Sequence, residues 1–180
     1  MHCIYICIPE LSTGHFSWTR PDPTRRNVDP TRPAISSKGP LPIPFSDDYC
    51  FVCGKDNPQG FKIEVRYAAA ELAAETELSI PREYQGWADV IHGGILSTLL
   101  DELMAHAVWH FAGPGLTISM EVRFHAPLKP GEPIRVRGVM HTTNGSRRQA
   151  EGEIIRLADG QRIASGKSRF LLTGKNPGPE

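Results

Sequence analysis

The stretch from Ile91 to Phe124 reads IHGGILSTLLDELMAHAVWHFAGPGLTISMEVRF. Apolar residues recur at three- and four-residue spacing from Ile95 to Phe111, which predicts one long helix with a broad buried face. Gly113-Pro114-Gly115 ends this pattern, and apolar and polar residues then alternate from Leu116 to Phe124, which predicts a strand. A long helix that leads directly into a strand is therefore the expected centre of the fold.

Further strands are predicted on both sides of this stretch. Before it, apolar and charged residues alternate from Phe61 to Tyr67, and Leu72 to Ile80 is predicted to be the partner strand. After it we expect three more strands. Ile134, Val136 and Met140 mark the first of them, and the turns Asn144-Gly145 and Asp159-Gly160 separate the first from the second and the second from the third, which ends at Leu172. Because one helix alone is available to cover the sheet, we expect an α+β fold in the order β-β-α-β-β-β-β, with an antiparallel sheet of about six strands around that helix.

The composition limits the chain to one domain and excludes some partners. Its 180 residues contain 20 Lys plus Arg and 20 Asp plus Glu, so no global charge attracts nucleic acid or an acidic membrane surface. No apolar run approaches the roughly 18 to 20 residues that a membrane helix needs. The start of the chain lacks the basic and small-residue pattern of a signal peptide, so we expect a cytoplasmic protein.

The two ends of the chain differ in composition from the middle. Half of the 16 prolines fall within residues 1–44, where no periodic apolar face is present. We therefore predict a disordered extension over 1–44, a folded domain over 45–173 and a flexible tail over 174–180. All four cysteines, Cys3, Cys7, Cys50 and Cys53, precede the regular structure, which favours reduced thiols over a disulfide framework.

The stretch from Tyr84 to Glu102 carries the candidate chemistry. Gly93 and Gly94 at a helix start would let a substrate approach backbone N–H groups, which can stabilise an oxyanion. Asp101 lies within the apolar helix, where burial costs several kcal/mol unless the carboxylate is paired or faces a cavity.

Two structural alternatives compete with this interpretation. The glycine pair could simply form a tight helix start capped by His92. Asp101 and Glu102 could form a solvated edge of the helix, the usual position of adjacent carboxylates. The combination of glycine pair and carboxylate favours a functional site.

These residues together resemble a known family. The chain has His92-Gly93-Gly94 with Asp101 nine residues after the histidine, preceded by Tyr84-Gln85-Gly86-Trp87. Further segments of the pattern are Cys50-Phe51-Val52-Cys53-Gly54, Asn57-Pro58-Gln59-Gly60, and the strand from Thr117 to Phe124 followed by Pro127 and Gly131. Over about residues 49–173 the sequence resembles hot-dog thioesterases of the phenylacetic-acid-degradation (PaaI-like) type.

The resemblance implies an acyl-CoA thioesterase that uses no cofactor beyond the coenzyme A of its substrate. Asp101 would be the general base or nucleophile, and the Gly93 N–H would donate to the thioester carbonyl. Thr117 would position water or the carboxylate, although alternation gives it the parity of the charged side of its strand. Gln85 would replace an Asn that some relatives carry about seven residues before the first glycine.

The spacing of Gly93 and Asp101 implies more than one chain. Eight residues of helix separate them by about 12 Å, too far for both to meet one carbonyl carbon. If both act on one thioester, the carboxylate must come from a second subunit across a two-fold axis. A homodimer is therefore expected, as the resemblance also implies, and a homotetramer remains an alternative.

Three other signals carry less weight. Cys50-x-x-Cys53 could bind zinc, but no second pair stands at suitable spacing, so we expect no metal site. His106 and His110 lack the Glu of a metalloprotease helix. Arg147 and Arg148 could hold coenzyme A phosphates, together with Gly94 at the helix start, or could be a solvated hairpin tip.

Two other functions remain open on the same fold. One is a non-catalytic acyl-CoA-binding or regulatory module, because a fold does not fix a function. Asp101 argues against it. The other is a hydratase or dehydratase, which would need a histidine and an acid at one β-carbon, whereas His92 precedes the glycine pair.

Overall fold

The computed structural model describes residues 48–141 and 145–173. The predicted extension over 1–44, the predicted tail over 174–180, Cys3, Cys7 and the Asn144 of one predicted turn lie outside these residues. The elements are β1 (Arg66–Ala68), β2 (Ala73–Ser79), β3 (Gln85–Trp87), β4 (Val90–Ile91), α1 (Gly93–Ala112), β5 (Gly115–Phe124), β6 (Pro133–His141), β7 (Arg147–Arg156) and β8 (Arg162–Leu172), with 3-10 turns at Ala69–Glu71 and Arg82–Tyr84.

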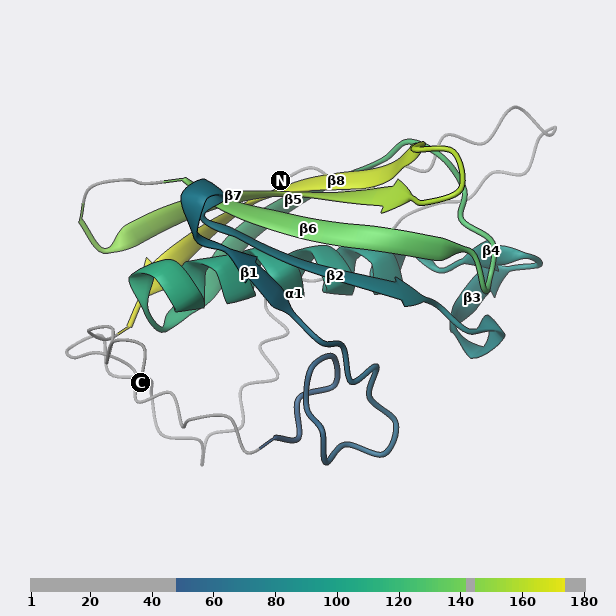
Figure 1. The fold of residues 1–180 in the computed structure, drawn as a ribbon, viewed down its shortest axis with the longest axis horizontal. Helices are drawn as coiled ribbons and strands as arrows, with labels where there is room; N and C mark the ends of the chain where they lie inside the picture. Colours follow the sequence, from purple (N-terminus) through teal and green to yellow (C-terminus); the bar gives the residue numbers. More distant parts are fainter. Residues whose placement is uncertain (1–47, 142–144, 174–180) are drawn as a thin grey trace, which may run out of the picture. The chain divides into compact units, whose positions relative to one another are not determined.

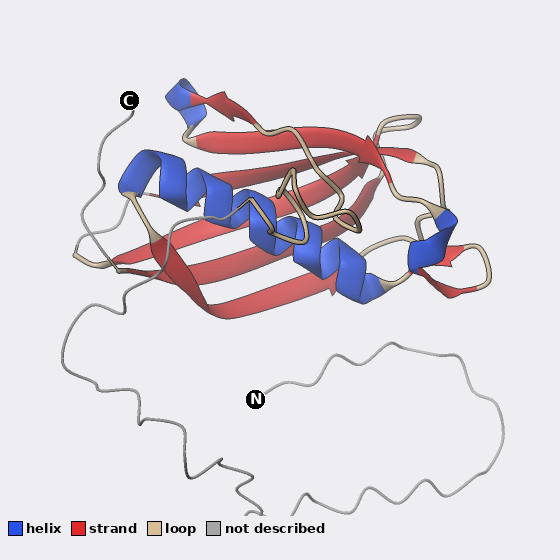
Figure 2. Ribbon diagram, turned by 90° about the horizontal axis from the view of Figure 1, so that it is seen from below, coloured by secondary structure: helices blue, strands red, loops and turns tan. Residues whose placement is uncertain are grey.

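A six-stranded antiparallel sheet packs on one side of the single long helix (Figure 1). The strand order is β1-β2-β6-β7-β8-β5, and β3 and β4 form a separate short hairpin. Seen from below, α1 crosses in front of the sheet (Figure 2). The predicted α+β architecture and the order of its helix and six main strands are confirmed. None of the helices in the described part of the chain is long and apolar enough to cross a membrane.

The core lies between α1 and the sheet. The buried helix positions repeat at the predicted spacing and are Leu96, Leu99, Leu100, Leu103, Met104, Ala107 and Val108. They meet buried side chains of the sheet, among them Ile134, Val136, Ile154, Ile163 and Phe170. Because alternate strand residues point to the helix, β6, β7 and β8 each contribute about every second side chain to this core.

A row of three paired glycines lies under the middle of α1. Gly138 of β6 pairs with Gly152 of β7, which pairs with Gly166 of β8. A Cβ atom built on Gly138 would stand 2.5 Å from the backbone carbonyl of Leu103. The absence of a side chain at Gly138 therefore lets the helix approach β6 closely, and this contact fixes how far α1 lies from the sheet.

The predicted strand from Phe61 to Tyr67 is wrong over most of its length, because β1 comprises Arg66–Ala68. Lys62 has a left-handed backbone (φ 50°), which interrupts an extended chain. The N–H groups of Phe61 and Ile63 bond to the carbonyls of Phe51 and Val52 instead of to a sheet. The alternation of apolar and charged residues from Phe61 to Tyr67 therefore goes with packing of this segment on the preceding loop, and not with a sheet. The β3–β4 hairpin was not predicted, since two to three residues give no measurable period.

The apolar side chains of β5 are less buried than their alternation predicts. Leu116, Ile118, Met120 and Phe124 are 38–51% exposed. β5 is the last strand of the sheet, and only β8 pairs with it. One edge of this ten-residue strand thus has no pairing strand among residues 48–141 and 145–173.

Candidate active site

The helix begins at a cap that the sequence offered as the structural alternative. The Nδ1 atom of His92 accepts a hydrogen bond of 2.9 Å from the Gly94 N–H. The His92 N–H in turn donates to the Tyr84 carbonyl at 3.0 Å, which fixes the β3–β4 hairpin beside the helix start. The Gly93 N–H donates to no group among residues 48–141 and 145–173. The His92 cap that the sequence offered as an alternative is therefore present, and among the described residues it leaves the Gly93 N–H as the one donor of the first turn without an acceptor.

Both glycines of the pair have close neighbours where a side chain would stand. A Cβ atom at Gly94 would lie 2.9 Å from His92 Nδ1, so a side chain would press on the cap. A Cβ atom at Gly93 would lie 3.1 Å from Cζ of Phe124. The helix start therefore lies against the end of β5, and a larger residue at Gly93 would fill the approach to its N–H.

Gln85 lies beside this helix start, at the beginning of β3. It pairs with Ile91, the residue before the cap. Its Oε1 atom is buried and has no hydrogen-bond partner among the described residues. Because buried amide oxygens are normally bonded, this atom calls for a partner from outside the described chain, such as water, substrate or a second subunit.

Asp101 lies two turns further along α1 and is oriented from the sheet edge. The Thr117 hydroxyl donates a hydrogen bond of 2.9 Å to its Oδ1 atom. Burial raises the pKa of Asp101 above its ordinary value, the Thr117 hydrogen bond opposes this shift, and the neighbouring charge of Glu102 adds to it. The carboxylate is half-buried and held at one oxygen.

A β-bulge brings Thr117 to Asp101. The register of β5 against β8 shifts between Thr117 and Ser119, so Thr117 pairs with the buried Phe170 and Met120 pairs with the buried Ser168. Directly opposed residues point to the same face of a sheet, so Thr117 shares the helix-facing side with Met120. Strict alternation had placed it on the opposite side, which the bulge corrects.

Glu102 belongs to a different cluster. Its Oε1 atom lies 3.2 Å from Nε2 of His106, and Cys50 Sγ lies 3.8 and 3.9 Å from its two oxygens. Burial would raise the pKa of Glu102, but hydrogen bonds from His106, Cys53 and Cys50 outweigh this effect and the net shift is downward. Burial, followed by its contacts with Glu102, raises the pKa of the Cys53 thiol.

Glu102 and its neighbours were not predicted as a site. Neither Asp101 nor Glu102 is a freely solvated edge, since both are part-buried and hydrogen-bonded. The Tyr67 hydroxyl forms a hydrogen bond of 2.8 Å with His106 Nδ1, and the Tyr67 ring stacks on His110. Burial is the main cause that raises the pKa of Tyr67. The spacing of Glu102 and His106, four residues apart in one helix, was the signal that could have found this pair.

Arg147 and Arg148 lie apart from the helix start. Phe170 of β8 pairs with Arg148 on one side and with Thr117 on the other, so Arg148 is two strands from Thr117. The Arg148 guanidinium donates to the carbonyls of Gly145 and Arg147. A hollow of about 640 Å³ lies among charged residues such as Arg137, Glu151 and Lys167 of the sheet, and it contains none of the predicted site residues.

Comparisons with known proteins agree with this architecture. The thioesterase superfamily model matches residues 88–162, and no curated protein matches the chain. A crystal structure of a thioesterase superfamily protein superimposes with a TM-score of 0.64 at 24% identity, covering 69% of this chain and 60% of that one. The present chain thus spans less than two thirds of that protein's length.

Two further structures are similar at lower identity. PaaI from the phenylacetic acid degradation operon of E. coli has a TM-score of 0.58 at 16% identity, covering 63% of this chain and 81% of that one. A Streptococcus mutans protein bound to acetyl-CoA has a TM-score of 0.59 at 13% identity, covering 63% and 90%. Identities this low indicate the fold alone. The described domain therefore has the hot-dog fold, and its residues 88–162 match the thioesterase superfamily.

Proposed function

We propose that this protein hydrolyses an acyl thioester, with acyl-CoA as the substrate class, and that Asp101 is its catalytic carboxylate. The superfamily match over residues 88–162 supports thioester hydrolysis. The observation that carries the assignment of Asp101 is the Thr117 hydroxyl, 2.9 Å from Oδ1, which orients a half-buried carboxylate in an apolar helix. A carboxylate held at one oxygen keeps the other available for chemistry.

The free oxygen of Asp101 has two possible tasks in the same reaction. It can remove a proton from the attacking water, or it can attack the thioester carbonyl and form an anhydride that water then opens. In both routes the C–S bond breaks and the thiolate leaves without a strong acid to protonate it. The Gly93 N–H stabilises the oxyanion that forms on the carbonyl.

A second subunit is needed to unite these groups. Within one helix Gly93 and Asp101 stand about 12 Å apart along the axis. The outer edge of β5, with which no described strand pairs, offers the surface, because long apolar edge strands usually pair or are covered. If two β5 strands pair antiparallel about their middle, Phe124 of each faces the Gly115 end of the other.

That pairing sets Gly93 of one subunit near Asp101 of the other. Gly93 lies against Phe124, and Asp101 is bonded to Thr117, two residues from Gly115. The two-fold axis exchanges these ends, so each dimer gains two equivalent composite sites. Gln85 lies beside the helix start, and its buried amide oxygen has no partner among the residues that the structure describes, so we assign it to the oxyanion side of the site.

The substrate carrier is proposed from chemistry and fold together. The acetyl-CoA bound to the S. mutans protein supports a coenzyme A thioester for this fold. Arg147 and Arg148, at the start of β7, provide guanidinium groups of the type that hold phosphates. We retain the PaaI-like type and the cytoplasmic location as parts of this proposal.

The first test is Asp101→Asn, assayed for hydrolysis over short, long and aryl acyl-CoA substrates. The amide keeps the shape and loses the base and nucleophile, so turnover should fall by about 10²- to 10⁴-fold with the fold retained. Asp56→Asn, at an exposed loop residue, is the matched control and should keep full activity. Wild-type turnover in Asp101→Asn refutes the mechanism. Acyl-CoA binding without hydrolysis by the wild type would identify a binding module instead.

The second test mixes subunits of Asp101→Asn and Gly93→Val. Each homodimer should be nearly inactive, since one lacks the carboxylate and the other has a blocked oxyanion donor. In the mixed dimer one composite site collects both changes and the other collects none, so about half of the activity per dimer should return. No recovery in a verified mixed dimer rules out a shared site.

A further inference from the structure

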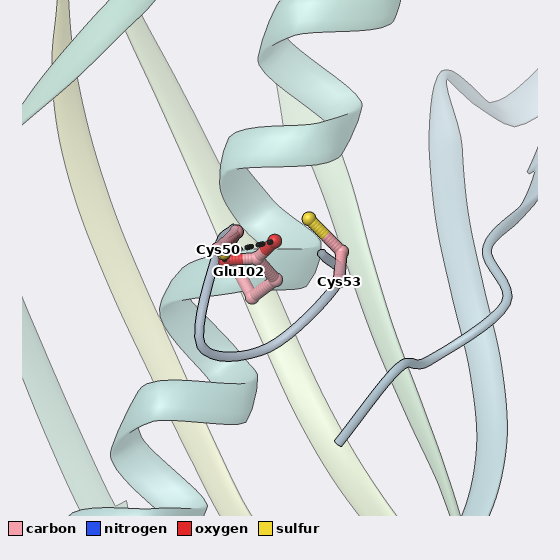
Figure 3. A group of neighbouring side chains, drawn as sticks. All are labelled: Cys50, Cys53 and Glu102. Atoms are coloured by element: carbon pink, nitrogen blue, oxygen red, sulfur yellow. Dashed lines mark hydrogen bonds between the residues drawn. The ribbon is translucent and has the colours of Figure 1, made fainter. Parts of the chain in front are cut away.

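Two thiols and a carboxylate meet beside α1, on the side of the helix away from the strands behind it (Figure 3). One donor atom each from Cys50, Cys53 and Glu102 lies within 4.8 Å of the other two. The two cysteines come from the loop before β1 and the glutamate from the middle of the helix. Sequence spacing could not reveal this meeting, because 49 or more positions separate the glutamate from the thiols.

We infer that this cluster is a zinc site, with Cys50, Cys53 and Glu102 as ligands. Zinc is bound by cysteine sulfur at about 2.3 Å and by carboxylate oxygen at about 2.0–2.2 Å, so neighbouring donors in a tetrahedron stand roughly 3.5–3.8 Å apart. Cys50 Sγ is already 3.8 Å from Glu102 Oε1. All three donor atoms lie within 4.8 Å of one another, so any pair needs to close by at most about 1 Å.

The loop that carries the thiols has the conformation that such a site requires. The Val52 N–H points at Cys50 Sγ with a separation of 3.4 Å, and the Gly54 N–H bonds to the Cys50 carbonyl at 3.0 Å. N–H groups directed at a sulfur stabilise a metal-bound thiolate. Gly54 has no room for a side chain, since its Cβ would stand 2.3 Å from the Cys50 nitrogen. The turn therefore holds both thiols on the side of the helix.

His106 supplies the fourth ligand. Its Nε2 atom lies 3.2 Å from Glu102 Oε1, close to the spacing of two donors on one zinc ion. Its Nδ1 atom already bonds to the Tyr67 hydroxyl at 2.8 Å. Zinc-bound histidines usually make such a second hydrogen bond, which fixes the ring and its tautomer. His106 lies outside the group of three whose donor atoms are within 4.8 Å of one another, so its imidazole must move toward the thiols to complete the tetrahedron.

The expected role of the metal is to fasten the loop to α1. The loop contributes Val52 and Ile63 to the buried core. Zinc binding releases the two thiol protons to solvent and replaces them with bonds to the ion. The ion would thereby hold the loop against the helix segment that also carries Asp101. Its role is structural, and it takes no part in the hydrolysis itself.

The test is zinc binding by the full chain, purified under reducing conditions and stripped with a chelator. A competition titration should give about one zinc ion per chain, and cobalt should give the charge-transfer absorption of a cobalt–thiolate bond. Cys50→Ser, Cys53→Ser and Glu102→Gln should each weaken binding by about 100-fold or more, and His106→Gln by at least about 10-fold. The double variant Cys3→Ser/Cys7→Ser is the matched control and should bind like the wild type.

Several outcomes overturn the inference. These are no zinc bound at micromolar concentration, binding that is lost with Cys3 and Cys7, or a Cys50–Cys53 disulfide in the reduced preparation. If the serine variants fail to fold, the cobalt spectrum of the wild type decides, since absence of a thiolate band excludes the site. Asp101→Asn should bind zinc normally, so failure of the zinc site and failure of the proposed hydrolysis are distinguishable.

Discussion

Alanine at Gly138 should push α1 away from the sheet. The new Cβ would stand 2.5 Å from the Leu103 carbonyl carbon and oxygen and 2.6 Å from the Met104 nitrogen, all of them helix backbone. An ordinary contact begins near 3.4 Å, so the helix must move by about 0.9 Å. Overpacking of a core typically costs about 1–3 kcal/mol, and a clash with backbone that cannot rotate away belongs at the upper end, about 3 kcal/mol.

The same shift should reach the proposed catalytic carboxylate. Asp101 lies two residues before Leu103, and its bond to Thr117 is 2.9 Å long. A displacement of about 0.9 Å would exceed the range of a hydrogen bond unless β5 follows the helix. Misplacement of a catalytic group by about 1 Å can lower the rate about 100-fold, so turnover should fall along with stability.

The two other glycines of the row are matched controls on neighbouring strands. At Gly166 the nearest atoms to a Cβ are at 3.4 Å, an ordinary contact, and removal of a strand glycine should leave stability unchanged or raise it by about 0.5–1 kcal/mol. At Gly152 the nearest atom is the Leu100 Cδ2 at 3.1 Å, a side-chain end that can give way, so a loss of about 1 kcal/mol is expected.

Urea unfolding at one fixed protein concentration measures the stability of all three variants, since the stability of the proposed dimer depends on concentration. The expected order of stability is Gly166→Ala above Gly152→Ala above Gly138→Ala. A Gly138→Ala protein as stable as Gly166→Ala would show that α1 does not depend on close approach at this point.

Three other changes test separate parts of the structure. Thr117→Val should lower turnover about 10-fold or more, whereas Thr117→Ser should keep most of it, because only the hydroxyl reaches Asp101. Equal turnover in the two variants would contradict the positioning role of Thr117. Ile118→Lys, at a side chain 51% exposed on the sheet edge, should shift the proposed dimer toward monomer in sedimentation analysis. An unchanged dimer would place the interface elsewhere. Thr76→Val should lower the free energy of unfolding by about 1–2 kcal/mol, measured by thermal or urea unfolding, because it removes the buried hydroxyl that donates to the Glu64 carbonyl at 2.7 Å. An unchanged free energy of unfolding would mean that this bond does not hold the segment before β1.

The sequence alone determined the elements whose period is long enough to read. The helix over Gly93–Ala112 and the strands β2 and β5 to β8 follow from spacings of three or four residues and of two, which each segment expresses through its own backbone. The helix cap at His92 and the glycine pair were likewise visible, because a cap involves residues that are neighbours in the chain.

The tertiary structure decided which faces meet. The bulge that turns Thr117 toward Asp101 reverses the parity read from the sequence, because one extra residue moves the preceding side chains to the other face. The edge position of β5 and the meeting of Cys50 and Cys53 with Glu102 depend on which segments pack together. Local periodicity specifies the conformation of a segment, whereas contacts between distant residues are set by the lowest free energy of the whole domain, so no single stretch of sequence contains them.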